Sequence, residues 1–435
     1  MIGLHEFLPI ILLSGLFVCL ITLVKTDFGI IVLIFSMLFS PELSVAQLGE
    51  RAVVVRIDDI LVLVVFFTWL VKMAVNKEFG LLKKSPLNLP ITVFISISIL
   101  STLFGIIKGA VTPFSGLFHV LKYIEYFMIY FLVINNLDNM KQAKRFIAFL
   151  LITCFLVCVY TSTKIGELGI EGRLSAPFEK EIGGEPNTLG GYLLLLFAVS
   201  LGVFLYSKSG IWKFFAGWLC LFIFPSFLFT LSRGSYLGFI FMYLAFIILT
   251  NRMRWPLIII LLLFVMLAPF LLPNSVIERI KSTFIPGVEY EALGARIVLD
   301  ESAAHRVESW KFIFKVLKES PILGFGVGGV PVLDTQLPYV LAETGIIGLW
   351  VFIWLLINIF RNGLWTLRNI RDDWSQGLAL GFLAGFIGLF FHSFSSQTFI
   401  VVRIMEPFWF LTAIIVMIPQ LSSSAEEGTE RQALA

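Results

Sequence analysis

The chain has 435 residues, of which 58% are hydrophobic and only 14% are charged, and 45 of them are phenylalanine. Its mean hydropathy of +0.94 excludes a soluble globular protein and indicates an integral membrane protein. The formal net charge of +3, with neither a basic arm nor an acidic tail, argues against nucleic acid as a partner.

Long apolar runs follow one another along the chain, and about 20 apolar residues suffice to cross a bilayer as a helix. The first run lacks the basic segment and the small-residue cleavage site of a signal peptide, so we interpret it as a retained span. The pattern predicts an all-α polytopic membrane protein with about 12 to 13 transmembrane helices, twelve if the short second run is re-entrant. The runs cover residues 7–24, 28–40, 58–75, 88–107, 117–135, 145–163, 188–206, 211–230, 234–250, 255–272, 339–360, 376–395 and 400–418.

Lysines and arginines in the connections predict the orientation. The connections after the third, fifth, seventh, ninth and eleventh runs are short and basic, so the positive-inside rule places them in the cytoplasm. The other connections then face outward, including the one at Arg233 and the long segment 273–338. Segments of that length are usually functional. The C-terminal residues 422–435 are predicted to form a disordered cytoplasmic tail.

The outer segment contains the stretch HRVESWKFIFKVLKES (305–320). At helical spacing it places apolar side chains on one face and lysines on another, and Pro321 ends it. We therefore expect an amphipathic helix that lies on the outer membrane–water interface.

Arginines are more frequent on the predicted outer face than the positive-inside rule allows. Because a guanidinium binds phosphate in a bidentate manner, this excess favours an outward-facing phosphate site. Two alternatives stay open: a snorkelling anchor in the case of Arg233, and salt bridges with nearby carboxylates such as Glu179 and Glu406. The outer arginines are Arg56, Arg173, Arg233, Arg279, Arg296, Arg306 and Arg403.

Polar residues gather just before and inside the eleventh run. GFGVGG (324–329) formally matches a dinucleotide fingerprint, but no strand precedes it and Pro331 blocks a following helix. A flexible turn is the first interpretation, and a nest of N–H groups facing an oxyanion is the alternative. Asp334 is a candidate general base or an N-terminal helix cap. Glu343, within the first turns of the span, requires a partner such as an outer arginine.

Small residues inside the runs predict packing and not chemistry. Gly381, Gly385 and Gly388 have the spacing of a close helix contact. The cysteines all lie inside apolar runs, where they act as small hydrophobic residues, so neither a disulfide framework nor a metal site is predicted.

An ordered set of motifs resembles a known family. SRG (232–234) follows a span, and the outer segment then carries R-x-x-x-W (306–310), P-x-x-G-x-G-x-G (321–328) and LAETGIIGL (341–349). Upstream, VRIDD, GRLSAPFE and GGEPNTLGGYL are similar to segments that precede the family's core. In this order the motifs resemble the bacterial O-antigen ligase and O-antigen polymerase superfamily of membrane glycan transferases.

The resemblance implies a substrate and a mechanism. The donor would be a glycan on a polyprenyl diphosphate at the outer leaflet of the bacterial inner membrane. It would be transferred to a glycan or lipid acceptor with inversion, without a metal or other cofactor and amid membrane lipids. Arg233 and Arg306 stand where the family keeps its diphosphate-binding arginines, and Arg173 and Arg403 are expected as further outward-facing contacts.

The resemblance also divides the chain. Residues 1–163 would form N-terminal transmembrane helices, and residues 164–421 would form the O-antigen ligase-like core that includes the outer loop 273–338. Residues 422–435 would form the tail.

The sequence departs from the ligases at the catalytic base. Ligases carry a histidine in H-N-x-Y-L ahead of the span, and counting back from Glu343 that place holds Asp334, while the asparagine place holds Thr335. Members without the histidine look more like polymerases, so polymerase mode is favoured over ligase mode. An alternative from another class is a lipid-linked oligosaccharide flippase or polysaccharide transporter. Because a flippase should carry its cations at mid-membrane, the outer position of these arginines favours the enzyme.

Overall fold

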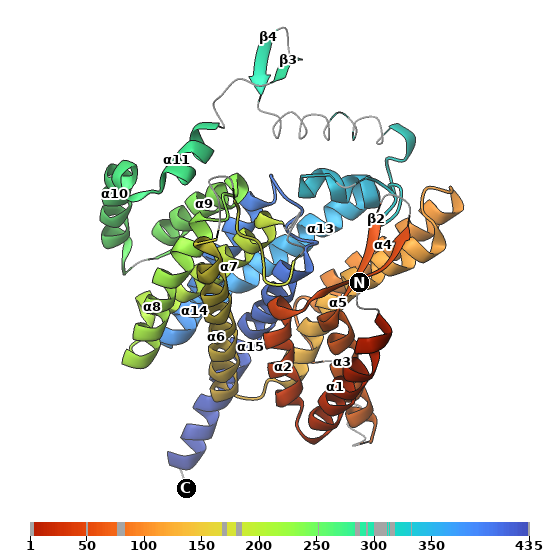
Figure 1. The fold of residues 1–435 in the computed structure, drawn as a ribbon. Coiled ribbons are helices and arrows are strands. Elements are labelled where there is room, and N and C mark those ends of the chain that lie inside the picture. The colour runs from red at the N-terminus through yellow and green to blue at the C-terminus, as the bar shows by residue number, and fades with distance from the viewer. Residues whose placement is uncertain are drawn as a thin grey trace.

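The computed structural model describes most of the chain as a helical bundle (Figure 1). It describes residues 4–48, 51–75, 83–167, 172–179, 185–250, 252–282, 288–292, 295–299, 311, 313, 318–319, 320–331 and 333–433. The helices are α1 (Leu4–Val24), α2 (Thr26–Phe39), α3 (Ile57–Val75), α4 (Asn88–Ile107), α5 (Pro113–Asn136), α6 (Met140–Ile165), α7 (Pro186–Tyr206), α8 (Gly210–Leu228), α9 (Arg233–Leu249), α10 (Arg254–Leu271), α11 (Asn274–Lys281), α13 (Gln336–Asn369), α14 (Asp373–His392) and α15 (Val402–Ala433).

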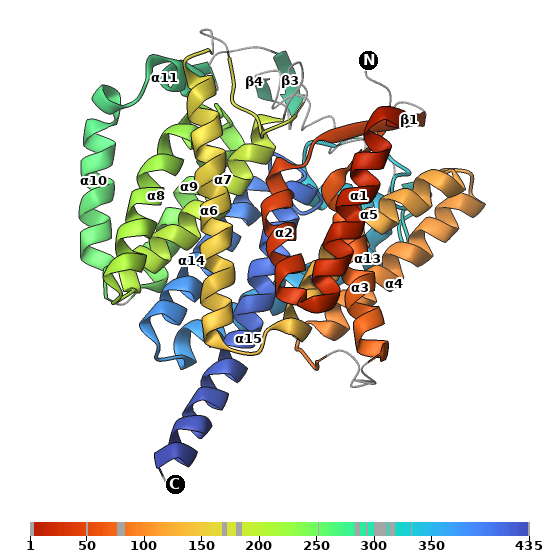
Figure 2. The same ribbon diagram turned by 60° about the horizontal axis from the view of Figure 1, so that its bottom comes forward.

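The all-α polytopic class predicted from the sequence is confirmed. Every apolar run falls mainly on one helix, and among the described residues nine helices are long and apolar enough to cross a membrane, while α2 and α9 are shorter apolar helices. Apolar α10 lies at the periphery beside α8 (Figure 2). Leu257 is its one buried residue, as expected of a helix whose remaining surface faces lipid.

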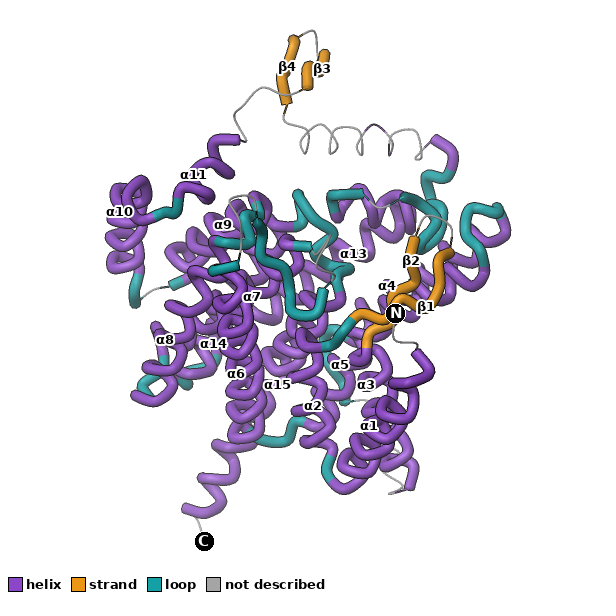
Figure 3. The backbone as a smooth tube through the Cα atoms, viewed as in Figure 1, coloured by secondary structure: helices purple, strands orange, loops and turns teal. Residues whose placement is uncertain are grey.

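Two short antiparallel hairpins were not predicted. One joins β1 (Glu42–Leu48) to β2 (Arg51–Arg56), and the other joins β3 (Val288–Ala292) to β4 (Ala295–Leu299). Both lie in stretches with β-branched residues, such as Val53 to Val55, which favour extended backbone. Figure 3 shows the β3–β4 hairpin standing apart from the helices.

The β3–β4 hairpin marks one end of the bundle. We call the end that carries β3, β4, α11 and the N-terminus of α9 the hairpin end, and the end from which α15 projects the opposite end (Figure 1). The structure differs from the predicted disordered tail, because α15 continues as a helix to Ala433. Glutamate, alanine and glutamine in that stretch have high helix propensity.

Close glycine contacts hold the centre of the bundle together. A Cβ atom on Gly381 would lie 2.5 Å from the carbonyl oxygen of Ala198 in α7, and one on Gly388 would lie 3.1 Å from that of Gly238 in α9. A Cβ atom on Gly385 would lie 2.9 Å from Leu195. The predicted close packing at these three glycines of α14 is therefore confirmed.

The predicted interfacial helix 305–320 lies mostly outside the described residues. Within it the structure describes Lys311, Ile313, Lys318, Glu319 and Ser320. Its amphipathic character stays a prediction.

Candidate functional site

The turn between α8 and α9 lies at the hairpin end and has an unusual backbone. Leu231 adopts φ of 48°, a left-handed conformation that is rare for a residue with a bulky side chain. The Tyr236 hydroxyl donates to the carbonyl of Leu228 and so ties α9 back onto the end of α8. Strained backbone of this kind persists where the surroundings over-determine it, and it is frequent at functional sites.

The SRG motif is explained by the start of α9. Ser232 is the N-cap, and its hydroxyl oxygen accepts from the backbone N–H of Ser235 at 3.2 Å. The Ser232 hydroxyl also donates to Asn187 at 2.6 Å. A Cβ atom on Gly234 would lie 1.7 Å from the hydroxyl oxygen of Ser395, so a larger residue there would push α9 off the α14–α15 loop. Arg233, between them, is the first residue of the helix and is half-buried.

Two further arginines converge on this turn. Arg173 donates from Nε to the carbonyl of Thr230 at 3.3 Å and from Nη2 to that of Leu231 at 3.4 Å. Arg279, in α11, donates to the same Leu231 carbonyl at 3.2 Å. Burial lowers the pKa of the Arg173 guanidinium, and the charges of Arg279 and Arg233 lower it further, although an arginine remains protonated. We call Arg173, Arg233 and Arg279 the arginine cluster; an anion among them would relieve the mutual repulsion.

Asp334 is exposed and precedes α13. The N-cap of α13 is Thr335, and no side chain caps the helix there, so the helix-cap alternative for Asp334 is not observed. Gln397 donates to the carbonyl of Leu333 at 2.6 Å, and the backbone N–H of Gln336 donates to that of Ser393 at 3.0 Å. The α14–α15 loop therefore holds both the Asp334 segment and Gly234.

The glycine-rich stretch is a fixed turn. Gly324, Gly326 and Gly328 have φ of 67°, 88° and 80°, a region open mainly to glycine. The Gly328 N–H donates to Glu343 Oε1 at 2.7 Å, and the Tyr123 hydroxyl donates to Glu343 Oε2 at 2.6 Å. The Glu343 carboxylate thus accepts one of the N–H groups that the nest interpretation would direct at an oxyanion.

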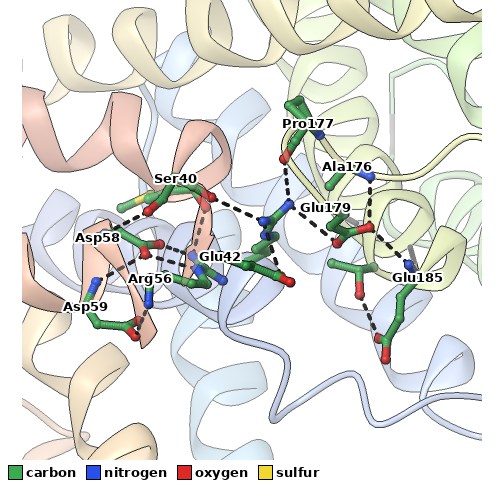
Figure 4. A network of polar contacts seen from close by, with 12 residues as sticks. Ser40, Glu42, Arg56, Asp58, Asp59, Ala176, Pro177, Glu179 and Glu185 are labelled. Carbon is green, nitrogen blue, oxygen red and sulfur yellow. Dashed lines mark hydrogen bonds and ion pairs between the residues drawn. The ribbon is translucent and has the colours of Figure 1, made fainter. Parts of the chain in front are cut away.

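Arg403 lies in the interior, at only 1% exposed. Its guanidinium donates to the carbonyls of Pro177 at 3.0 Å and Ser40 at 3.2 Å, and it pairs with Glu42 and Glu179, each at 3.4 Å. Figure 4 shows these contacts. In the structure Arg403 makes the salt bridges that the sequence left open as an alternative, and it fixes the 172–179 segment that carries Arg173.

Arg56 extends the same network. It donates from Nε to Asp58 at 3.0 Å (Figure 4) and from Nη2 to the carbonyl of Met37 at 3.2 Å. Its Nη2 also lies 3.5 Å from Glu406. Together these ion pairs and hydrogen bonds join the ends of α2, α3 and α15 around the 172–179 segment. Buried pairs of this kind fix geometry more than they add stability.

Arg306 lies outside the described residues, so its position relative to the arginine cluster stays a prediction. Within the described part of the chain, no group of three or more His, Cys, Asp or Glu side chains could hold a metal ion.

Comparison with known families identifies this part of the chain. Residues 218–353 match the O-antigen ligase family model, Wzy_C. The matched segment includes the α8–α9 turn, Arg279, Asp334 and Glu343, and the resemblance to the O-antigen ligase and polymerase superfamily is thereby confirmed. Arg173 and Arg403 lie outside it, because the match covers about a third of the chain. No curated protein matches the chain.

Sequence reasoning did not select Arg279 as a site residue. It was one of several arginines predicted to lie on the outer face, and no spacing showed that α11 folds back onto Leu231. The available signal was the amphipathic stretch NSVIERIK, whose buried Val276 anchors the helix that presents Arg279.

The stability of this end of the bundle is expected to depend on pH through Glu179. Burial raises the pKa of Glu179 from its ordinary 4.5 to about 7, against the opposing charge of Arg403. Between those two values the folded protein holds a proton that the unfolded chain has released, so stability falls as the pH rises through this window. Glu179→Gln should flatten that fall in thermal unfolding from pH 4.5 to 8. Equal slopes for the two proteins would contradict the assignment.

Proposed function

We propose that the protein is an integral membrane glycosyltransferase that polymerises glycan units delivered on a polyprenyl diphosphate, at the outer face of the bacterial inner membrane. The observation that supports this most is the arginine cluster, two of whose members lie in the segment matched by the O-antigen ligase model. Guanidinium groups held by backbone carbonyls are suited to a diphosphate, because they bind its oxygens in a fixed orientation.

In the proposed reaction the arginines act on the leaving group, which is the lipid diphosphate. An acceptor hydroxyl oxygen attacks the anomeric carbon, the bond from that carbon to the diphosphate oxygen breaks, and the electron pair leaves with the lipid diphosphate. Arg233, Arg173 and Arg279 then stabilise the charge that develops on the diphosphate, and Arg306 joins them in this proposal. Attack from the face opposite the leaving group inverts the anomeric centre.

The hydroxyl proton needs an acceptor, and Asp334 is the group proposed. It is exposed, and its segment shares the α14–α15 loop with Gly234, next to Arg233. Arg403 is proposed as a positioning residue, because its bond to the Pro177 carbonyl holds the segment on which Arg173 lies.

The proposal is tested by incubating the purified protein with lipid-linked repeat units, with and without a separate acceptor. We expect lengthened glycans on gels without any added acceptor. Transfer only in the presence of a second acceptor would assign ligase mode instead. Movement of the lipid across liposome membranes without glycan transfer would show that the protein is a flippase and not a glycosyltransferase.

A further inference from the structure

A second cationic site lies at the opposite end of the bundle from the arginine cluster. Here a cavity of about 440 Å³ opens between the C-terminal ends of α7, α9 and α13 and the start of α14. Its polar lining consists of Tyr206, Arg252, Arg368 and Gln376, and aliphatic side chains such as Ile248 complete the wall. The cavity lining therefore combines two arginines with aliphatic side chains, which are Ile248, Leu249, Leu364 and Leu367.

The charges around the cavity do not balance. Arg368 makes no hydrogen bond or ion pair with any described residue. Arg252 pairs with Asp373, but that carboxylate also pairs with Lys208 at 2.6 Å, so two cations share one anion. Asp372, the other carboxylate nearby, caps α14 by accepting from Ser375. Three cations thus face two carboxylates, and both carboxylates are already engaged.

Other side chains already donate to the helix-end carbonyls beside the cavity. The guanidinium of Arg254 donates to the carbonyls of Ile247 at 3.1 Å and Ile248 at 3.3 Å, so these two carbonyls in the last turn of α9 have donors. The Gln376 amide donates to the Ile370 carbonyl at 2.6 Å. Because these helix-end carbonyls already have donors, Arg252 and Arg368 are not needed to satisfy them.

The surroundings indicate where the anion comes from. Ile248 is 70% exposed and Trp365, on the neighbouring face of α13, is 53% exposed, as expected of side chains at the edge of the lipid phase. Basic pockets between transmembrane helices at the level of the headgroups bind anionic lipids.

We propose that this cavity binds the phosphate group of an anionic phospholipid in the adjacent leaflet, with Arg252 and Arg368 as its ligands and the acyl chains along the apolar wall. By the positive-inside pattern that leaflet is the cytoplasmic one. The site is independent of the proposed glycan transfer, since it lies at the other end of the helices.

Native mass spectrometry of the detergent-purified full chain tests the site. With phosphatidylglycerol we expect a retained lipid adduct, and with zwitterionic phosphatidylcholine a much weaker one. Each of Arg252→Gln and Arg368→Gln should weaken the phosphatidylglycerol adduct about fivefold to tenfold, and the double variant should lose it. Arg371→Gln is the matched control, because that exposed arginine lies at the same end but does not line the cavity, and it should bind as the wild type does.

Two outcomes would overturn the proposal. If the double variant retains phosphatidylglycerol as well as the wild type, the arginines do not form a phosphate site. If inorganic phosphate displaces the adduct at equal concentration, the site takes a soluble phosphate and not a lipid. Arg368→Gln keeps the test decisive even if Arg252→Gln disturbs folding, because Arg368 has no ion pair among the described residues to lose.

Discussion

Arg233→Ala is expected to lower the rate of glycan transfer at least about a hundredfold, the usual cost of removing a group that stabilises a leaving charge. Arg233 is the first residue of α9, and Ser232 and Gly234 fix the helix start around it. The capping bonds at this helix start are made by Ser232 and Ser235 and do not depend on the Arg233 side chain. Transfer is measured as glycan length on gels from purified protein.

Two companion variants separate charge from geometry. Arg233→Lys keeps the positive charge but cannot bind a phosphate group in a bidentate manner, so it should remain at least about tenfold impaired. Arg254→Ala is the matched control, since Arg254 is likewise the first residue of its helix but lies at the opposite end. Full activity of Arg233→Lys would show that the site needs charge alone, and equal loss in Arg254→Ala would show a general folding effect.

Local sequence rules anticipated the elements that carry the site. Apolar runs gave the helices because a bilayer requires about 20 such residues and internal hydrogen bonding. The glycine spacing in α14 predicted its contacts, because a stripe of small residues has few other uses in an apolar helix.

Contacts between segments that are distant in the sequence could not be predicted from local sequence patterns. Arg403 and Arg233 are both arginines at the hairpin end, yet Arg403 is buried against Glu42 and Glu179 while Arg233 belongs to the arginine cluster. What distinguishes them is the path of the 172–179 segment, which no local pattern encodes. The sequence likewise predicted that Glu343 needs a partner, such as an outer arginine, but did not identify the partners that the structure shows, the Tyr123 hydroxyl and the Gly328 N–H.

The glycine-rich turn has a structural role next to the proposed catalytic residue Asp334. The Gly328 N–H donates to the Glu343 carboxylate and the Gly326 N–H donates to the Glu343 carbonyl at 2.9 Å, so this turn is fixed against the start of α13. Asp334 lies just ahead of that helix, and the rigid support fixes its backbone while its side chain stays exposed.

Asp334→Asn is expected to lower the transfer rate by about 10²- to 10⁴-fold, the range for loss of a general base. The amide has nearly the same shape as the carboxylate but cannot accept the proton of the acceptor hydroxyl. Donor binding, measured by retention of the lipid-linked substrate, should be unchanged, because Asp334 does not belong to the arginine cluster. A matched control is Asp138→Asn, which alters an exposed aspartate paired with Lys83 at the other end of the bundle.

Asp334→His tests whether this position carries the base. Because related ligases are expected to place a histidine there, the imidazole should restore transfer that the asparagine variant loses. An exposed imidazole titrates near pH 6.5, so the rate of the histidine variant should fall as the pH drops below about 6.5, while the residual rate of Asp334→Asn should not follow that curve. If Asp334→Asn transfers glycan at the wild-type rate, the proton leaves by another route, and the arginine cluster would then act with a base supplied elsewhere.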